Sequence, residues 1–177
     1  SKASVSAPFF WLARRKATAL VKPDVARLYP KQAARIAGIA AGSGVDERFL
    51  YLGLSAELML AKVDYCLGCC SAVGLTGAAA TEPMIAKNFD YPEIFAPLAV
   101  SRCNRPDGAF ASRDVSVGPF AGNHDGINEH GLTVCYNYGY GLGTNAAAAP
   151  ITLVCQELLE HCRTTAEAIA MLGTLKW

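Results

Sequence analysis

The chain has 177 residues, 52% of them hydrophobic and 18% charged, with a mean hydropathy of +0.22. This composition excludes an intrinsically disordered chain and is typical of one folded domain with a sizeable core. The sequence holds no run of eighteen uncharged apolar residues, which argues against a membrane span, and its formal charge of +1 argues against a nucleic-acid partner.

The charge is unevenly distributed along the chain. The first 35 residues carry eight basic side chains against one acid, Asp24, which gives them a net charge of +7 and leaves −6 for the remainder. A basic start such as residues 9–22 is typical of a targeting or membrane-surface segment, and also of a solvated helix face packed on an acidic body. Seven cysteines, an odd number, favour reduced thiols, so we expect a cytoplasmic protein unless the basic start is a targeting segment.

The first 65 residues are predicted to be mainly helical. Residues 31–41 have helical composition, and Gly42 and Gly44 are suited to end that helix. Asp46 is the expected N-cap of a second helix over residues 47–63, whose apolar side chains recur at a helical period.

The pattern changes to strands at Cys66 and returns to helices at Pro150. Two short strands are predicted at residues 70–75 and 84–91, and a turn at residues 128–131 leads into a strand of alternating character. Pro150 is suited to the first turn of a helix over residues 151–162, and Thr164 with Glu167 forms a capping box for the next. This order predicts an α+β layered fold, and the few predicted strands lead us to expect part of a longer product.

The cysteine-rich stretch 66–74, CLGCCSAVG, is compatible with several chemistries. Cys66 and Cys69 have the spacing of zinc ligands, with His124 and His130 as possible partners, although a second cysteine pair is missing. A redox dithiol normally opens a helix, whereas these residues precede a strand. The cysteines are otherwise buried packing residues at a strand edge, or one of them is a nucleophile whose base is its own α-amino group after cleavage of the preceding bond.

Four short motifs, in order, resemble a known enzyme family. Cys70 begins CSAV, and KNFDY at residues 87–91 is similar to an Arg-Asn-x-Asp-aromatic motif about twenty residues after the nucleophile. The segments 125–134 and 156–172 resemble the turn and helix pair that follow. Together they are similar to the N-terminal nucleophile hydrolases of the acyl-coenzyme A:6-aminopenicillanate acyltransferase (peptidase C45) family, to which choloylglycine hydrolases are related.

The resemblance implies an αββα sandwich, incomplete in this chain. Residues 1–69 would be a mainly helical pro-region, and residues 70–177 the N-terminal part of the catalytic domain. It implies an enzyme that cleaves itself before the nucleophile and then acts on a small amide or acyl thioester through an acyl-enzyme. It implies no cofactor or metal ion, and a partner that is the rest of its own precursor or a second chain.

The same resemblance implies roles for individual residues. Cys70 would be the nucleophile, Asp90 would orient its α-amine, Asn128 would donate to an oxyanion, and Ser71 would assist self-cleavage. Lys87 stands where relatives have arginine, and lysine lacks arginine's bidentate fork.

Alternatives remain open for these assignments. Cys69 competes as nucleophile because Gly68-Cys69 is a familiar cleavage junction. Asp90 is also suited to form a turn and Asn128 to adopt a left-handed turn conformation. A non-catalytic relative that binds small molecules, or a metal protein, is the alternative function. An apolar acyl pocket is predicted from the following aromatic residues, which are equally suited to a core: Phe89, Tyr91, Tyr136, Tyr138 and Tyr140.

Overall fold

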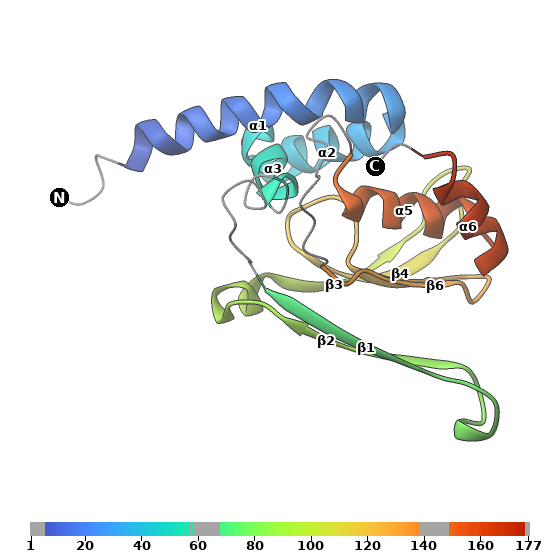
Figure 1. Ribbon diagram of the computed structural model, residues 1–177. Coiled ribbons are helices and arrows are strands. Elements are labelled where there is room, and N and C mark those ends of the chain that lie inside the picture. The colour runs from blue at the N-terminus through green and yellow to red at the C-terminus, as the bar shows by residue number, and fades with distance from the viewer. Residues whose placement is uncertain (1–5, 57, 59–67, 139–148, 176–177) are drawn as a thin grey trace.

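The fold is known from a computed structural model that describes residues 6–56, 58, 68–138 and 149–175. Figure 1 shows three layers: helices above, a four-stranded sheet in the middle and a two-stranded ribbon below. The α+β class predicted from the sequence is confirmed. The described residues place no second helical layer outside the ribbon, so the complete αββα sandwich stays a prediction.

The N-terminal helices confirm the predicted helix end at Gly44 and the helix start after Asp46, but the helix predicted over residues 47–63 ends at Leu54. They are α1 (Ser6–Leu28), α2 (Pro30–Ser43) and α3 (Glu47–Leu54). Gly44 ends α2 with a left-handed φ of 71°, a conformation in which glycine has no steric penalty. The Asp46 side chain accepts a hydrogen bond from the Arg48 N–H and so caps α3. None of the described helices is both long and apolar enough to cross a bilayer.

The strands form two antiparallel sheets. The ribbon pairs β1 (Cys69–Leu75) with β2 (Met84–Asp90). The larger sheet is a meander of β3 (Ala99–Asn104), β4 (Ser112–Val117), β5 (Asp125–Asn128) and β6 (Thr133–Cys135), in that order. Residues 77–79 and 93–98 form short 3-10 turns.

Strands β3, β4 and β5 were not predicted. In β4 the reason is that polar side chains are buried on the face toward the helices. Asp114 on β4 accepts hydrogen bonds at 2.8 Å from Arg102 Nε and at 2.5 Å from Asn104 Nδ2, both on β3. Arg102 also donates to the carbonyl oxygen of Phe120 at 2.9 Å. The buried positions of β4 therefore carry no hydrophobic alternation that would reveal a strand.

The C-terminal helices are α5 (Ile151–His161) and α6 (Thr165–Leu172). Pro150 is the N-cap of α5 rather than part of its first turn. At α6 the Thr164 hydroxyl accepts from the Glu167 N–H, as the predicted capping box requires. Helix α5 lies on the sheet face opposite the ribbon (Figure 1).

One hydrophobic core joins the N-terminal helices to α5. The core is made of fully or nearly fully buried residues from α1, α2, α3 and α5 and from the loops before α2, β5 and α5: Val21, Val25, Tyr29, Ile36, Leu50, Tyr51, Ala121, Ala149, Leu153 and Val154. The predicted division at residue 69/70 is therefore a hypothesis about processing, and it does not separate two independent cores.

A buried polar network also fastens α2 to α5. Glu160 of α5 is 1% exposed, and Arg35 of α2 binds its carboxylate at 2.5 Å. Gln32 donates to the same carboxylate at 3.1 Å and to that of Glu157 at 2.8 Å. Because a buried carboxylate without a counter-charge is costly, this network makes the position of α2 on α5 specific.

Replacing Arg35 with methionine should lower the free energy of unfolding by about 3 kcal/mol, because it leaves the Glu160 carboxylate buried without its cation. Urea denaturation measures this difference. Arg27→Met is the matched control, since Arg27 is 60% exposed beside Asp24 and its loss should cost less than about 1 kcal/mol. Equal effects of the two substitutions would contradict a structural role for the buried pair.

Candidate active site

The register of the ribbon decides which side chains face the large sheet. Cys70 lies opposite Phe89, and Ala72 lies opposite Lys87. Opposed residues share a face and alternate residues return to it, so Cys70, Phe89 and Lys87 lie on one face of the ribbon. Lys87 contacts the large sheet, which identifies this as the inner face. Cys69 and Asp90, which lie opposite each other, belong to the outer face.

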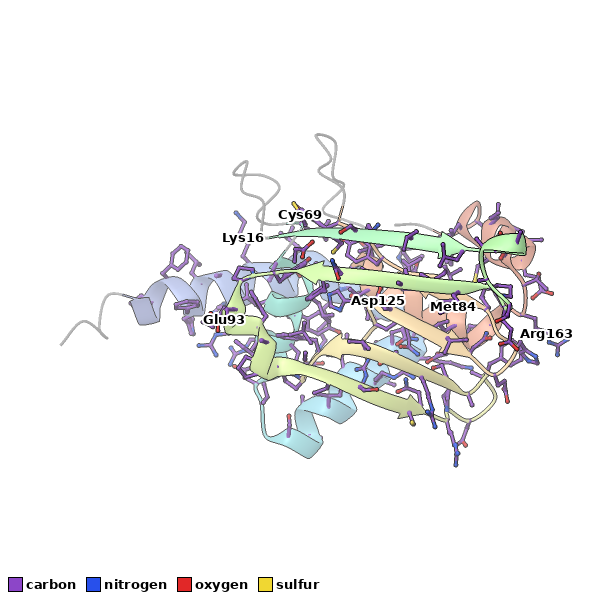
Figure 2. The ribbon with its side chains drawn as sticks, turned by 90° about the horizontal axis from the view of Figure 1, so that it is seen from below. Lys16, Cys69, Met84, Glu93, Asp125 and Arg163 are labelled. Atoms are coloured by element: carbon purple, nitrogen blue, oxygen red, sulfur yellow. The ribbon has the colours of Figure 1, made fainter. Side chains whose placement is uncertain are left out.

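Lys87 joins the ribbon to the large sheet. Its ammonium group lies 2.6 Å from Asp125 Oδ1 at the start of β5 and also donates to the carbonyl oxygen of Tyr136 after β6. The Lys87 side chain is 6% exposed and that of Asp125 is 22% exposed. Figure 2 shows Asp125 beside β2, in a view from the ribbon side. The pair is mostly shielded from water, so removing either charge leaves the other without its counter-charge in a poorly hydrated place.

His124 lies beside this ion pair in a group of aromatic rings. Its ring meets Phe89 edge-on at 5.0 Å between centroids, and Phe89 stacks on Tyr91 at 4.0 Å. Burial, followed by the repulsion of Lys87, lowers the pKa of His124 to about 4, so the imidazole is neutral at pH 7. His124 Nδ1 is buried and has no hydrogen-bond partner among the described residues.

Two other thiols near the ion pair are poor candidates for a nucleophile. Burial raises the pKa of Cys155 to about 12, and burial followed by the charge of Asp125 raises that of Cys135. A thiol with a raised pKa holds little thiolate at neutral pH. Cys70, on the inner face, is half-buried, whereas Cys69 is exposed.

Asn128 is engaged in a structural role. Its Nδ2 donates to the carbonyl oxygens of Leu159 at 3.0 Å and Cys162 at 2.7 Å, at the end of α5. Its Oδ1 accepts from the backbone N–H groups of His130 and Leu132 and so closes the predicted turn. Both amide hydrogens are used in this arrangement, and the oxyanion role expected from the sequence stays a prediction.

The exposed Asp90 carboxylate lies near the predicted cleavage junction. Asp90 ends β2 opposite Cys69, and a Cβ at Gly68 would lie only 2.6 Å from the Asp90 carbonyl oxygen. Glycine at position 68 thus has a packing reason that is independent of any cleavage. Its presence before Cys69 is weaker support for cleavage at that position than the sequence suggested.

The remaining predicted sites lie apart or outside the described residues. Cys66 and Tyr140 lie outside them, and Tyr138 is half-buried. His130 packs edge-on against Phe110 at 4.4 Å and takes no part in the aromatic group around His124. Among the described residues, the side chains close enough to share a metal ion are Glu157, Glu160 and His161, none of which the sequence suggested.

Sequence reasoning named His124 only as a possible zinc partner and gave Asp125 no role, although Asp125 begins the segment 125–134 that resembles the family's turn. Lys87 and Asp125 are 38 residues apart and meet only when the ribbon lies against the sheet.

A comparison with family models matches residues 78–176 to the acyl-coenzyme A:6-aminopenicillanic acid acyl-transferase family. The match covers more than half of the chain, which therefore belongs to this family. Membership implies an acyltransferase or hydrolase. The matched residues include Lys87, Asp90 and Asn128, whereas Cys70 precedes them. No curated protein matches the chain.

Replacing Lys87 with methionine should lower the free energy of unfolding by about 2–3 kcal/mol and speed hydrogen exchange in β1 and β2, because Asp125 loses its counter-charge at the ribbon contact. Lys22→Met is the matched control. Lys22 forms an ion pair of similar length with Glu47 but is 44% exposed, so its loss should cost less than about 1 kcal/mol. Unchanged hydrogen exchange of β1 and β2 in Lys87→Met would contradict the conclusion that Lys87 holds the ribbon against the large sheet.

The lowered pKa of His124 predicts a pH dependence of stability. The folded pKa of about 4 lies below the unfolded value of 6.5, so the unfolded chain binds the proton first as the pH falls. When the pH falls from 7.5 to 4.5, protonation of this residue should lower the free energy of unfolding by about 2–3 kcal/mol. Urea denaturation of His124→Phe at both pH values should show a smaller loss than the parent chain.

Proposed function

We propose that this chain carries the nucleophile of an autoprocessing cysteine amidohydrolase or acyltransferase, in which Cys70 becomes the new amino terminus. Membership of the family supports acyl transfer or hydrolysis. The observation that favours Cys70 over Cys69 is the register of the ribbon. It directs Cys70 to the inner face, beside the aromatic group, and directs Cys69 away from it. Cys70 is half-buried on the inner face, whereas Cys69 on the outer face is exposed.

Self-cleavage begins with an N→S acyl shift. The Cys70 sulfur attacks the carbonyl carbon of Cys69, the peptide bond to Cys70 nitrogen breaks, and that nitrogen takes the thiol proton. Water then hydrolyses the resulting thioester, which leaves a carboxylate on Cys69 and a free α-amine on Cys70. Ser71, next in the strand, is the predicted assistant of this step.

In the matured chain the α-amine of Cys70 is the base. A free α-amine titrates near neutral pH, so it takes the thiol proton and the thiolate attacks an amide or thioester carbonyl. The protonated amine then donates to the leaving group, and water or an acceptor amine releases the acyl group and restores the thiol. The cysteine thereby carries both acid and base on one residue.

Asp90 is suited to hold that amine. It lies opposite Cys69 in the ribbon, one position from the partner of Cys70. Once cleavage detaches Cys69, the carboxylate borders the new amino terminus, and a charge-assisted hydrogen bond orients the ammonium group. Lys87 has a different role here, because Asp125 balances its charge and the carbonyl oxygen of Tyr136 accepts a second hydrogen bond from it. It positions the ribbon rather than acting on the acyl group.

The aromatic group supports an apolar acyl substituent in a small-molecule substrate. Phe89 lies opposite Cys70, and it is flanked by Tyr91 and His124. Since His124 is neutral at pH 7, this face carries little charge apart from the balanced ion pair. An apolar acyl chain or ring would lie here with less desolvation cost than a charged one.

A non-catalytic relative that binds small molecules is the second candidate function. The bonded state of Asn128 favours it, because the expected oxyanion donor is already used by the end of α5. Under this alternative, the chain keeps the family's fold and leaves Cys70 within an intact polypeptide.

Intact-mass spectrometry of the purified chain during incubation at pH 7.5 decides between the two. Processing should yield fragments 1–69 and 70–177, and Cys70→Ala should remain whole. Cys69→Ala should still be cut, and Cys103→Ala controls for loss of an exposed thiol elsewhere. Cleavage one residue earlier, abolished only by Cys69→Ala, would transfer the role to Cys69.

Activity provides the second measurement. The matured chain should hydrolyse an aryl-acyl thioester, and Cys70→Ala should reduce that rate by more than about a thousandfold. A chain that stays whole and whose thioester hydrolysis is unchanged in Cys70→Ala would favour the binding function.

A further inference from the structure

The N-terminal end of α1 carries a contiguous group of exposed apolar side chains. Their relative exposures are 70% for Phe9, 51% for Phe10, 50% for Trp11 and 60% for Leu12. We call these four residues, together with the adjacent Arg15 and Lys16, the α1 tip. Monomeric proteins seldom expose several large apolar residues side by side unless that surface binds something.

The α1 tip lies beyond the part of the helix that packs on the body. The packing side of α1 is marked by Ala17, Val21 and Val25, which are 0–2% exposed and recur every four residues. The first fully buried residue of α1 is thus Ala17, and the described residues before Leu12 are exposed. Figure 1 shows this end of α1 projecting past the other helices. The apolar tip therefore adds nothing to the core of this chain.

The cations of α1 distinguish the tip from an ordinary apolar patch. The first 23 residues contain no aspartate or glutamate. Arg14 lies 3.7 Å from Asp46, and Lys22 lies 2.5 Å from Glu47. Arg15 and Lys16 are the exposed cations between these two ion pairs. They project next to the aromatic residues with no acid close in sequence to neutralise them.

Apolar and basic side chains share the same rows of the helix. Trp11 and Arg15 are four residues apart, and the guanidinium lies 4.6 Å from the centre of the indole ring. Leu12 and Lys16 have the same spacing, which places them on one side of the helix. Each row thus offers an apolar group and, one turn along, a cation.

We propose that the α1 tip binds the surface of an anionic membrane, with its aromatic residues inserted at headgroup depth and Arg15 and Lys16 against the lipid phosphates. Tryptophan and phenylalanine suit this interface, and juxtaposed cations add attraction to anionic lipid. A second copy of the chain is a poorer occupant, because two tips of like charge repel each other. The helix lies on the bilayer and does not cross it. This inference is independent of the acyl chemistry at Cys70.

Vesicle flotation with the full chain tests the proposal. The probes are phosphatidylcholine vesicles with and without 30% phosphatidylglycerol. The chain should float with the anionic vesicles, and the triple substitution Phe9→Ser, Phe10→Ser, Trp11→Ser should abolish flotation. Neutralising both cations, as Arg15→Gln with Lys16→Gln, should weaken binding more than about tenfold, since each contributes roughly fivefold. Raising the salt concentration should act in the same direction.

Matched controls separate the tip from general effects of charge and hydrophobicity. Ile94→Ser removes an apolar residue that is 76% exposed elsewhere. Lys31→Gln with Arg163→Gln removes two cations outside the tip; Figure 2 shows Lys16 and Arg163 far apart. Both control variants should bind like the parent. In a Trp177→Phe background, Trp11 is the single tryptophan, and its emission should shift to the blue when anionic vesicles are added.

Three results would overturn the proposal. The first is absence of flotation with anionic vesicles. The second is flotation that the triple serine variant retains. The third is concentration-dependent self-association that the triple serine variant abolishes, without vesicle binding, because the tip would then be a protein interface. Circular dichroism of the triple variant establishes that its fold is kept, which is expected because the tip has no contacts in the core.

Discussion

The Lys87–Asp125 ion pair is the contact on which the candidate site depends. The ribbon that carries Cys70 has few buried side chains of its own, and its outer face is open. Lys87 holds it against the start of β5 and the residue after β6 at once. Because the pair is largely withdrawn from water, it specifies one position of the ribbon. That position turns Cys70 toward the large sheet. It also brings Phe89 against His124, whose burial keeps the imidazole neutral.

A second polar connection gives the N-terminal helices a role in the same architecture. Helix α2 supplies Gln32 and Arg35 to the carboxylates of α5, and α5 in turn receives the amide of Asn128 from the turn between β5 and β6. A cut at residue 70 would therefore leave two pieces that share one core and one buried network. Such pieces are expected to remain associated, since neither can bury these groups alone.

The sequence predicted local structure best where the signal was itself local. Gly44, Asp46 and Thr164 end or begin helices as their side chains and backbone freedom require. Both ribbon strands were located as well. Strands β3 and β4 were not predicted from the sequence. Asp114 is buried on β4, and its hydrogen-bond donors, Arg102 and Asn104, come from β3. Asn128 was correctly placed in a turn. Its side-chain N–H groups donate to two carbonyl oxygens at the end of α5, 31 and 34 residues away.

The sequence by itself determined the class of the fold, the family and the residues that could act, because capping, strand alternation and short motifs are properties of neighbouring residues. Tertiary structure alone decided which of them meet. It turned the ribbon face with Cys70 toward the large sheet, paired Lys87 with Asp125, and bonded the Asn128 amide to the end of α5. These outcomes depend on strand register and on long-range partners competing for the same donors and acceptors, and no spacing along the chain encodes that competition.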